Sequence, residues 1–230
     1  MAAAVIYELL RKKHCLASPR SWSSIFRVTR GKMVRTPLYV AAANGHQEIV
    51  RLLLGTVRVD VNSRNYHGQT PFNEAARNGH EGVVKLLLAT CVDVDSRNNF
   101  GNTPLSGGTS ENHEVVVKLL LATGQVDINS KDAYGCTPLL CAASNGNEEI
   151  GRLLLETGHL DVDSKDSGGW TALSWAASEG HEAVVKQLRA TGRVDINSKD
   201  SRGRTPLSKA ASVGHEGVVK LLLETGQVDV

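Results

Sequence analysis

Residues 203–226, GRTPLSKAASVGHEGVVKLLLETG, decide the fold, because they are the clearest copy of a unit that recurs along the chain. The threonine near the start of the unit recurs at intervals of 34, 33, 34, 34 and 34 residues, and proline follows it in all copies but one. A strict period of this length is typical of an array in which each unit packs only against its neighbours. The threonines are Thr36, Thr70, Thr103, Thr137, Thr171 and Thr205.

Each unit predicts two helices. Thr205 and Pro206 mark the start of the first, because threonine caps a helix and proline at the first helical position has no N–H left unpaired. In the fourth unit the first helix is expected over residues 139–144, and Gly146 ends it because glycine suits the left-handed conformation. A second helix is expected over residues 216–224. Its apolar face is too wide for one contact, so neighbouring units must cover it on two sides. This face consists of Val218, Val219, Leu221, Leu222 and Leu223.

The pattern G-x-T-P-L-x-x-A-A-x-x-G-H-x-x-V-V-x-L-L-L resembles the ankyrin repeat over about 195 of the 230 residues. The 34-residue spacing resembles the type found in large fungal ankyrin arrays. The resemblance implies an all-α solenoid in which every repeat contributes two antiparallel helices and a hairpin-like finger. We expect six repeats, at about 34–67, 68–100, 101–134, 135–168, 169–202 and 203–230.

The third repeat departs from this pattern. Gly107 and Gly108 stand where the first helix needs good helix formers, and each glycine costs about 1 kcal/mol there relative to alanine. The second repeat is one residue short near Cys91. We therefore expect the second and third repeats to be the least stable part of the array.

Residues 1–33 lie before the clear repeats and form a basic segment. Residues 5–10, VIYELL, resemble a second helix, which suggests half of a decayed repeat that caps the first clear one. A solvated linker or a remnant of another domain is an alternative. So is a mitochondrial presequence, because residues 14–32 are basic and contain no acid.

Composition and charge argue against several classes of function. Residues 36–230 carry 18 basic and 23 acidic side chains, which make a poor surface for nucleic acid. The chain has no run of 18 apolar residues, so no membrane span is predicted. The four cysteines form no C-x-x-C pair. This favours a reducing compartment, the cytoplasm or the nucleus, and argues against a structural zinc site.

Histidine recurs at one position of the repeat, which raises the question of a metal site. Packed helices lie about 8–10 Å apart, so equivalent histidines are too far apart to share zinc at bonds of about 2.1 Å. The sequence also contains no phosphate-binding loop and no nucleophile elbow. We predict no metal, no cofactor and no catalytic residue. We interpret the recurrent histidines as polar residues at the start of the second helix: His46, His80, His113, His181 and His215.

Positions that vary between repeats are candidates for contact with a partner, because the recurring positions hold the stack together. Six aromatic residues, Tyr39 among them, lie near a finger or on a first helix, where we expect no role in the core. Tyrosine and tryptophan are favoured anchors of interfaces, and the resemblance implies binding by the fingers and first helices. The predicted binding strip comprises Tyr66, His67, Gln69, Phe100, Asn102, Tyr134, Trp170, Trp175, Arg202, Arg204 and Lys209.

The sequence therefore predicts a monomeric protein–protein interaction scaffold and no enzyme. The strip, concave in the ankyrin fold, would hold a folded protein or an extended segment, and neither nucleic acid nor a membrane is an expected partner. The alternative is a fragment of a larger fungal signalling receptor, with the array as sensor and an NTPase domain elsewhere. The sixth repeat motivates this alternative, because it stops at Val230 before its finger is complete.

Overall fold

The structure, a computed structural model, describes residues 28–29, 32–33, 36–56 and 59–228. Within these residues the chain forms twelve helices and one short antiparallel ribbon, β1 (Val28–Thr29) paired with β2 (Lys32–Met33). The helices are α3 (Pro37–Ala43), α4 (Gln47–Leu54), α5 (Pro71–Arg77), α6 (Glu81–Leu88), α7 (Pro104–Ser110), α8 (Glu114–Leu121), α9 (Pro138–Asn145), α10 (Glu148–Glu156), α11 (Ala172–Glu179), α12 (Glu182–Ala190), α13 (Pro206–Val213) and α14 (Glu216–Leu223).

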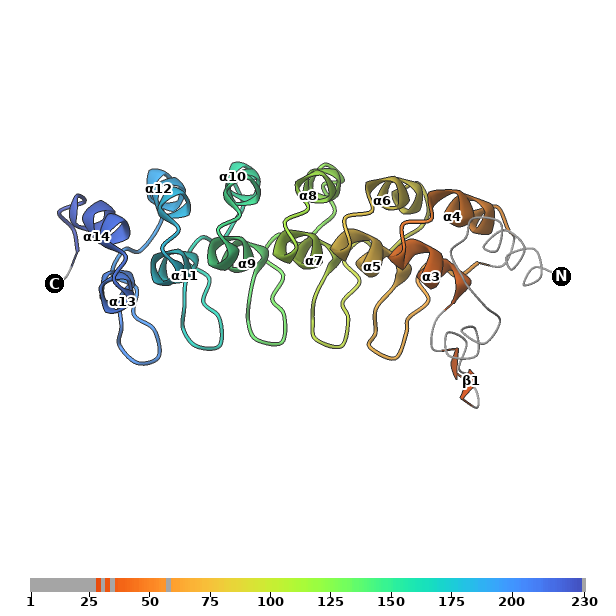
Figure 1. The fold of residues 1–230 in the computed structure, drawn as a ribbon, viewed down its shortest axis with the longest axis horizontal. Helices are drawn as coiled ribbons and strands as arrows, with labels where there is room; N and C mark the ends of the chain where they lie inside the picture. Colours follow the sequence, from red (N-terminus) through yellow and green to blue (C-terminus); the bar gives the residue numbers. More distant parts are fainter. Residues whose placement is uncertain (1–27, 30–31, 34–35, 57–58, 229–230) are drawn as a thin grey trace.

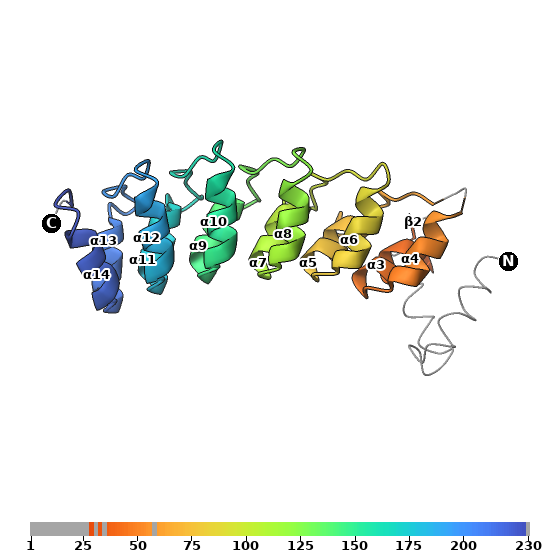
Figure 2. The same ribbon diagram turned by 90° about the horizontal axis from the view of Figure 1, so that it is seen from above.

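The helices form two layers in an open row (Figure 1). The first helix of each pair, α3 to α13 in odd numbers, lies between the layer of second helices and the loops that project beyond it. Viewed from above, the pairs follow one another in chain order (Figure 2). Each helix packs against its own partner and against the equivalent helix of the next pair. The predicted all-α solenoid is confirmed, with the ribbon as its one departure among the described residues; residues 5–10 lie outside them.

Helix starts follow the local chemistry of the sequence. The Thr205 hydroxyl accepts a hydrogen bond of 3.2 Å from the backbone N–H of Ser208, which satisfies one of the free donors of the first turn. Helix α11 begins in the same way at Ala172, so the cap suffices without the proline. The threonines that cap a first helix are Thr36, Thr70, Thr103, Thr137, Thr171 and Thr205.

The core lies between the two layers and runs without interruption from α3 to α14. Ala176 and Ala177 of α11 are fully buried, as are Val185 and Leu188 of α12. Small residues on the first helix let the next pair approach closely, and the leucines of the second helix fill the space between pairs. Helix α7 forms in spite of Gly107 and Gly108.

The recurrent histidines join neighbouring repeats. His215 begins α14, and its Nε2 lies 2.9 Å from the carbonyl oxygen of Ser178 in the preceding repeat. His181 makes the equivalent contact with Ser144 at 3.1 Å. Where the fourth repeat has Asn147, its amide donates to the Thr109 carbonyl at 2.8 Å. The interpretation of the histidines as starts of the second helix is confirmed. The rings of His80, His181 and His215 also contact the end of the first helix of the preceding repeat.

Candidate binding surface

Each finger turns tightly around one side chain. Oδ1 of Asp166 accepts hydrogen bonds from the backbone N–H groups of Gly168 and Trp170, at 2.8 and 2.9 Å. Such a turn fixes the residues at the tip. These turn residues were not among the predicted site residues, although one stands five positions before each of five threonines: Asn65, Asn98, Asp132, Asp166 and Asp200.

The fingers are also bonded to one another. The N–H of Asn99 donates to the carbonyl of His67 at 2.9 Å, and the N–H of Ala133 donates to that of Phe100 at 2.8 Å. The next two fingers continue the series, from Ser167 to Tyr134 at 2.9 Å and from Ser201 to Gly168 at 3.0 Å. Because these bonds are between backbones, they hold the tips in register whatever side chains the tips carry.

Three predicted binding residues stand exposed on this row. Tyr66, Phe100 and Tyr134 have 60%, 51% and 68% of their surface accessible. The His67 ring lies between the first two, with its centroid 3.7 Å from that of Tyr66 and 6.5 Å from that of Phe100. The three rings stand at the tips of successive fingers, and among the described residues they are the large apolar side chains exposed on this row.

Another four predicted residues form a cluster farther along the row. The rings of Trp170 and Trp175 lie with centroids 4.3 Å apart. Nε1 of Trp175 donates to Oδ2 of Asp166 at 3.0 Å, which ties the pair to a finger turn. The Lys209 ammonium lies over the Trp170 ring, 2.6 Å from its centroid, and the Arg204 guanidinium carbon lies 5.6 Å from the same centroid. A cation over an indole face is a favourable contact, so this cluster is already packed within the chain.

Lys209 lies beneath the surface. Only 2% of its side chain is accessible, and its ammonium forms an ion pair with the equally buried Asp200 at 3.0 Å. Burial lowers the pKa of Lys209, and Asp200 opposes that shift. Burial raises the pKa of Asp200, but donors from Arg204, Lys209 and Arg202 outweigh it and hold that pKa well below its ordinary value. Lys209 therefore shapes the surface through Trp170, whereas Arg202 and Arg204 are exposed.

The expectation that Tyr39 lies outside the core is wrong. Its side chain is buried, with 4% accessible. The phenol donates to Oε1 of Gln69 at 3.3 Å and accepts from Nδ2 of Asn65 at 3.0 Å. The finger of the next repeat covers this position of the first helix, which is why the equivalent Asn73 and Ser106 are buried as well.

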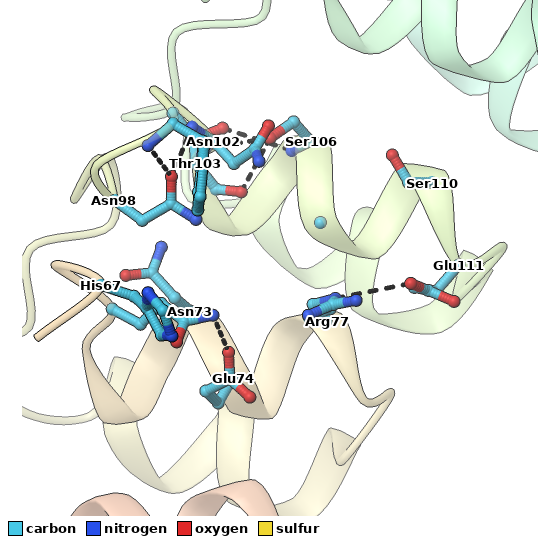
Figure 3. A pocket seen from close by; sticks show the side chains of 13 residues that line it. His67, Asn73, Glu74, Arg77, Asn98, Asn102, Thr103, Ser106, Ser110 and Glu111 are labelled. Carbon is cyan, nitrogen blue, oxygen red and sulfur yellow. Dashed lines mark hydrogen bonds and ion pairs between the residues drawn. The ribbon is translucent and has the colours of Figure 1, made fainter. Parts of the chain in front are cut away.

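A pocket of about 380 Å³ opens between α5 and α7. The fingers contribute four predicted residues to its wall, and the helices contribute polar side chains, among them the ion pair between Arg77 and Glu111 with N and O atoms 3.4 Å apart (Figure 3). The pocket was not predicted from the sequence, in which the unusual Gly107 of its wall is the one sign of it. The residues that line it include His67, Gln69, Phe100, Asn102, Glu74, Arg77, Ser110 and Glu111.

Burial raises the pKa of the Cys136 thiol to about 12 and also raises the pKa of Cys141, so neither is a thiolate nucleophile at neutral pH. In the part of the chain that the structure describes, no group of three or more His, Cys, Asp or Glu side chains is arranged to hold a metal ion. No helix among the described residues is long and apolar enough to cross a bilayer.

Comparison with known proteins agrees with this architecture. The family model for ankyrin repeats (3 copies) matches residues 6–98, 83–166 and 158–230. The chain therefore belongs to the ankyrin repeat family, whose members are generally protein–protein interaction modules.

Solved structures with the same fold include an ankyrin repeat domain from Acinetobacter baumannii AYE. It is 27% identical, with a TM-score of 0.75 over 84% of this chain and 98% of that one. Another is the ankyrin repeat protein EF0377, 28% identical, with a TM-score of 0.76 over the same shares of the two chains. No curated protein sequence matches the chain.

Proposed function

We propose that the chain is a non-enzymatic scaffold that binds a protein partner on its finger tips and first helices. The row of exposed rings carries this proposal: Tyr66, Phe100 and Tyr134 have half or more of their surface accessible. Aromatic anchors dominate the energy of many interfaces, and apolar groups held together on a surface are typical of binding sites. The hydrogen-bonded fingers supply the rigid support, so little conformational entropy is lost when a partner covers the rings.

The strip extends from Tyr66 to the exposed Arg202 and Arg204 near the end of the row. It therefore offers aromatic anchors along three successive fingers and positive charge where the fifth and sixth repeats meet. A monomeric array would present this whole length to one extended segment or to the face of one folded protein. The free thiols of Cys91, Cys136 and Cys141 support a location in a reducing compartment, such as the cytoplasm or the nucleus.

Affinity capture from the native source tests the strip. The test variant is Phe100→Ala with Tyr134→Ala, because both rings are exposed at finger tips and their loss leaves the core intact. Trp170 is a poorer choice, since its ring packs against Lys209 and Trp175. Each anchor is expected to contribute about 2 kcal/mol, so the double variant should lose most of the partner that the wild type recovers.

The matched control is Leu52→Ala with Val115→Ala, which removes apolar side chains that are 54% and 42% accessible on the second helices α4 and α8. This control should recover the partner as the wild type does. Equal recovery by the aromatic variant and the wild type would exclude the strip as the binding surface.

The receptor alternative, an array that serves as the sensor of a larger protein with an NTPase domain, stays a prediction. No contact among the described residues favours it over the scaffold. A transcript that continues in frame after Val230 into an NTPase domain would support it.

A further inference from the structure

We propose that the pocket between α5 and α7 receives an arginine side chain of the bound protein. This inference rests on the proposed function and adds to it the chemistry of one contact. The pocket lies on the binding strip itself, because His67, Gln69, Phe100 and Asn102 belong both to the strip and to the pocket wall.

The pocket exists because Gly107 has no side chain. At the same position of the first helix the other repeats carry Val40, Glu74, Cys141, Trp175 and Lys209, and the last two belong to the cluster around Trp170. A Cβ atom at Gly107 would lie 3.3 Å from the Cβ of Arg77, so a longer side chain there would extend along the pocket wall. Gly107 has helical geometry within α7, which means that no backbone constraint requires glycine.

The charge of the wall favours a cation. Glu74 and Glu111 contribute two carboxylates, and Arg77 contributes one guanidinium. Arg77 is paired with Glu111, at 3.4 Å, whereas Glu74 receives a hydrogen bond from the neutral amide of Gln69. A carboxylate can accept about four hydrogen bonds. Glu74 therefore keeps capacity for a positively charged donor, and an acidic side chain would meet two carboxylates.

The shape and the aromatic wall favour arginine over lysine. Phe100 stands at the pocket with half its surface accessible, next to the His67 ring. A guanidinium group is planar, stacks on aromatic faces and bonds carboxylates with two parallel N–H donors. An ammonium group is less well suited to each of these contacts. In Figure 3 Glu74 and Arg77 project from one helix toward the cavity, with Glu111 on the far side. Stacking on Phe100 and pairing with Glu74 would therefore engage one guanidinium at once.

A library of random peptides displayed on phage tests the inference with three purified proteins. They are the wild type, Gly107→Leu and the matched control Gly107→Ala. Leucine at this position occupies part of the pocket, and alanine adds only the Cβ atom, so the control separates occupation of the pocket from any change in helix α7. Circular dichroism should show the same helix content in all three proteins. The best peptide selected on the wild type is then synthesised with arginine or with citrulline, which keeps the shape of the side chain and removes its charge.

Peptides selected on the wild type and on Gly107→Ala should share an arginine at a fixed position, and those selected on Gly107→Leu should not. Citrulline in place of this arginine, or Glu74→Gln in the protein, should weaken binding by about tenfold or more, as expected for the loss of a charge-assisted hydrogen bond. Two outcomes would overturn this inference and leave the proposed function standing. In the first, the selected peptides bind the aromatic strip but show no preference for arginine. In the second, they bind Gly107→Leu as well as they bind the wild type. Failure to select any peptide that depends on Phe100 and Tyr134 would count against both.

Discussion

Nζ of Lys209 lies 3.0 Å from Oδ2 of Asp200, and only 2% and 1% of the two side chains are accessible. Removal of one partner from a buried ion pair is costly, because the other charge remains in a poorly solvated place. Lys209→Met should therefore lower the free energy of unfolding by about 3 kcal/mol, the low end of the usual range because Arg204 still pairs with Asp200. Urea unfolding followed by circular dichroism measures the loss.

The matched control for this substitution is Lys220→Met. Lys220 pairs with Glu216 at 3.8 Å, but both side chains are largely exposed, at 74% and 87%. Such surface pairs contribute about 0.5 kcal/mol or less. If the two variants lost the same stability, burial of the Asp200 pair would have no energetic consequence.

Asp200 also predicts a dependence of stability on pH. Its pKa is held below the ordinary value of 3.8, because the donors around it outweigh the effect of burial. A depressed pKa means that the folded state favours the carboxylate, so this stabilisation is present above about pH 4 and is lost as the pH falls below it. Asp200→Asn should be less stable than the wild type at pH 7, and the difference should shrink toward pH 2. A difference that stayed constant or grew on acidification would contradict the assignment.

Gly108 offers a stabilising substitution. It is helical in α7, where the equivalent residues of the neighbouring repeats are Ala75 and Ala142. A Cβ atom there would meet Val116 Cγ1 at 3.4 Å, which is an ordinary contact. Gly108→Ala should therefore raise the free energy of unfolding by about 1 kcal/mol through helix propensity. Hydrogen exchange should be slower in α7, and unchanged exchange would mean that Gly108 does not weaken the third repeat.

Substitution of Gly146 by alanine should lower the free energy of unfolding, whereas the same substitution at Gly108 should raise it. The φ of +67° at Gly146 places it in the left-handed region, and a Cβ atom would lie 2.6 Å from Nδ1 of His181. Gly146→Ala should strain the backbone and displace the ring that binds the Ser144 carbonyl, so we expect a loss of about 2 kcal/mol. Thermal unfolding measures the effect. A neutral result would show that the contact of His181 with the preceding repeat contributes no stability.

Most of the architecture was predictable because it follows from short-range chemistry. Threonine caps, the glycine at Gly146 and the leucine-rich second helices act over a few residues, and the period repeats them. The burial of the aromatic residues was predicted in part: Tyr66, Phe100 and Tyr134 are exposed at the finger tips, whereas the expectation that Tyr39 lies outside the core was wrong. The same local rules could not distinguish the buried Tyr39 from the exposed Tyr66 and Tyr134, because burial at Tyr39 depends on the finger of the next repeat.

The sequence by itself determined where the helices begin and end, how many units follow one another and which faces they bury. Tertiary structure alone decided that Lys209 lies under Trp170, that the His181 ring bonds Ser144 and that Gly107 opens a pocket beside Glu74. All three relationships join residues of neighbouring repeats. They exist only after neighbouring repeats have packed, because packing sets the distance and the exclusion of water on which ion pairs, ring contacts and cavities depend.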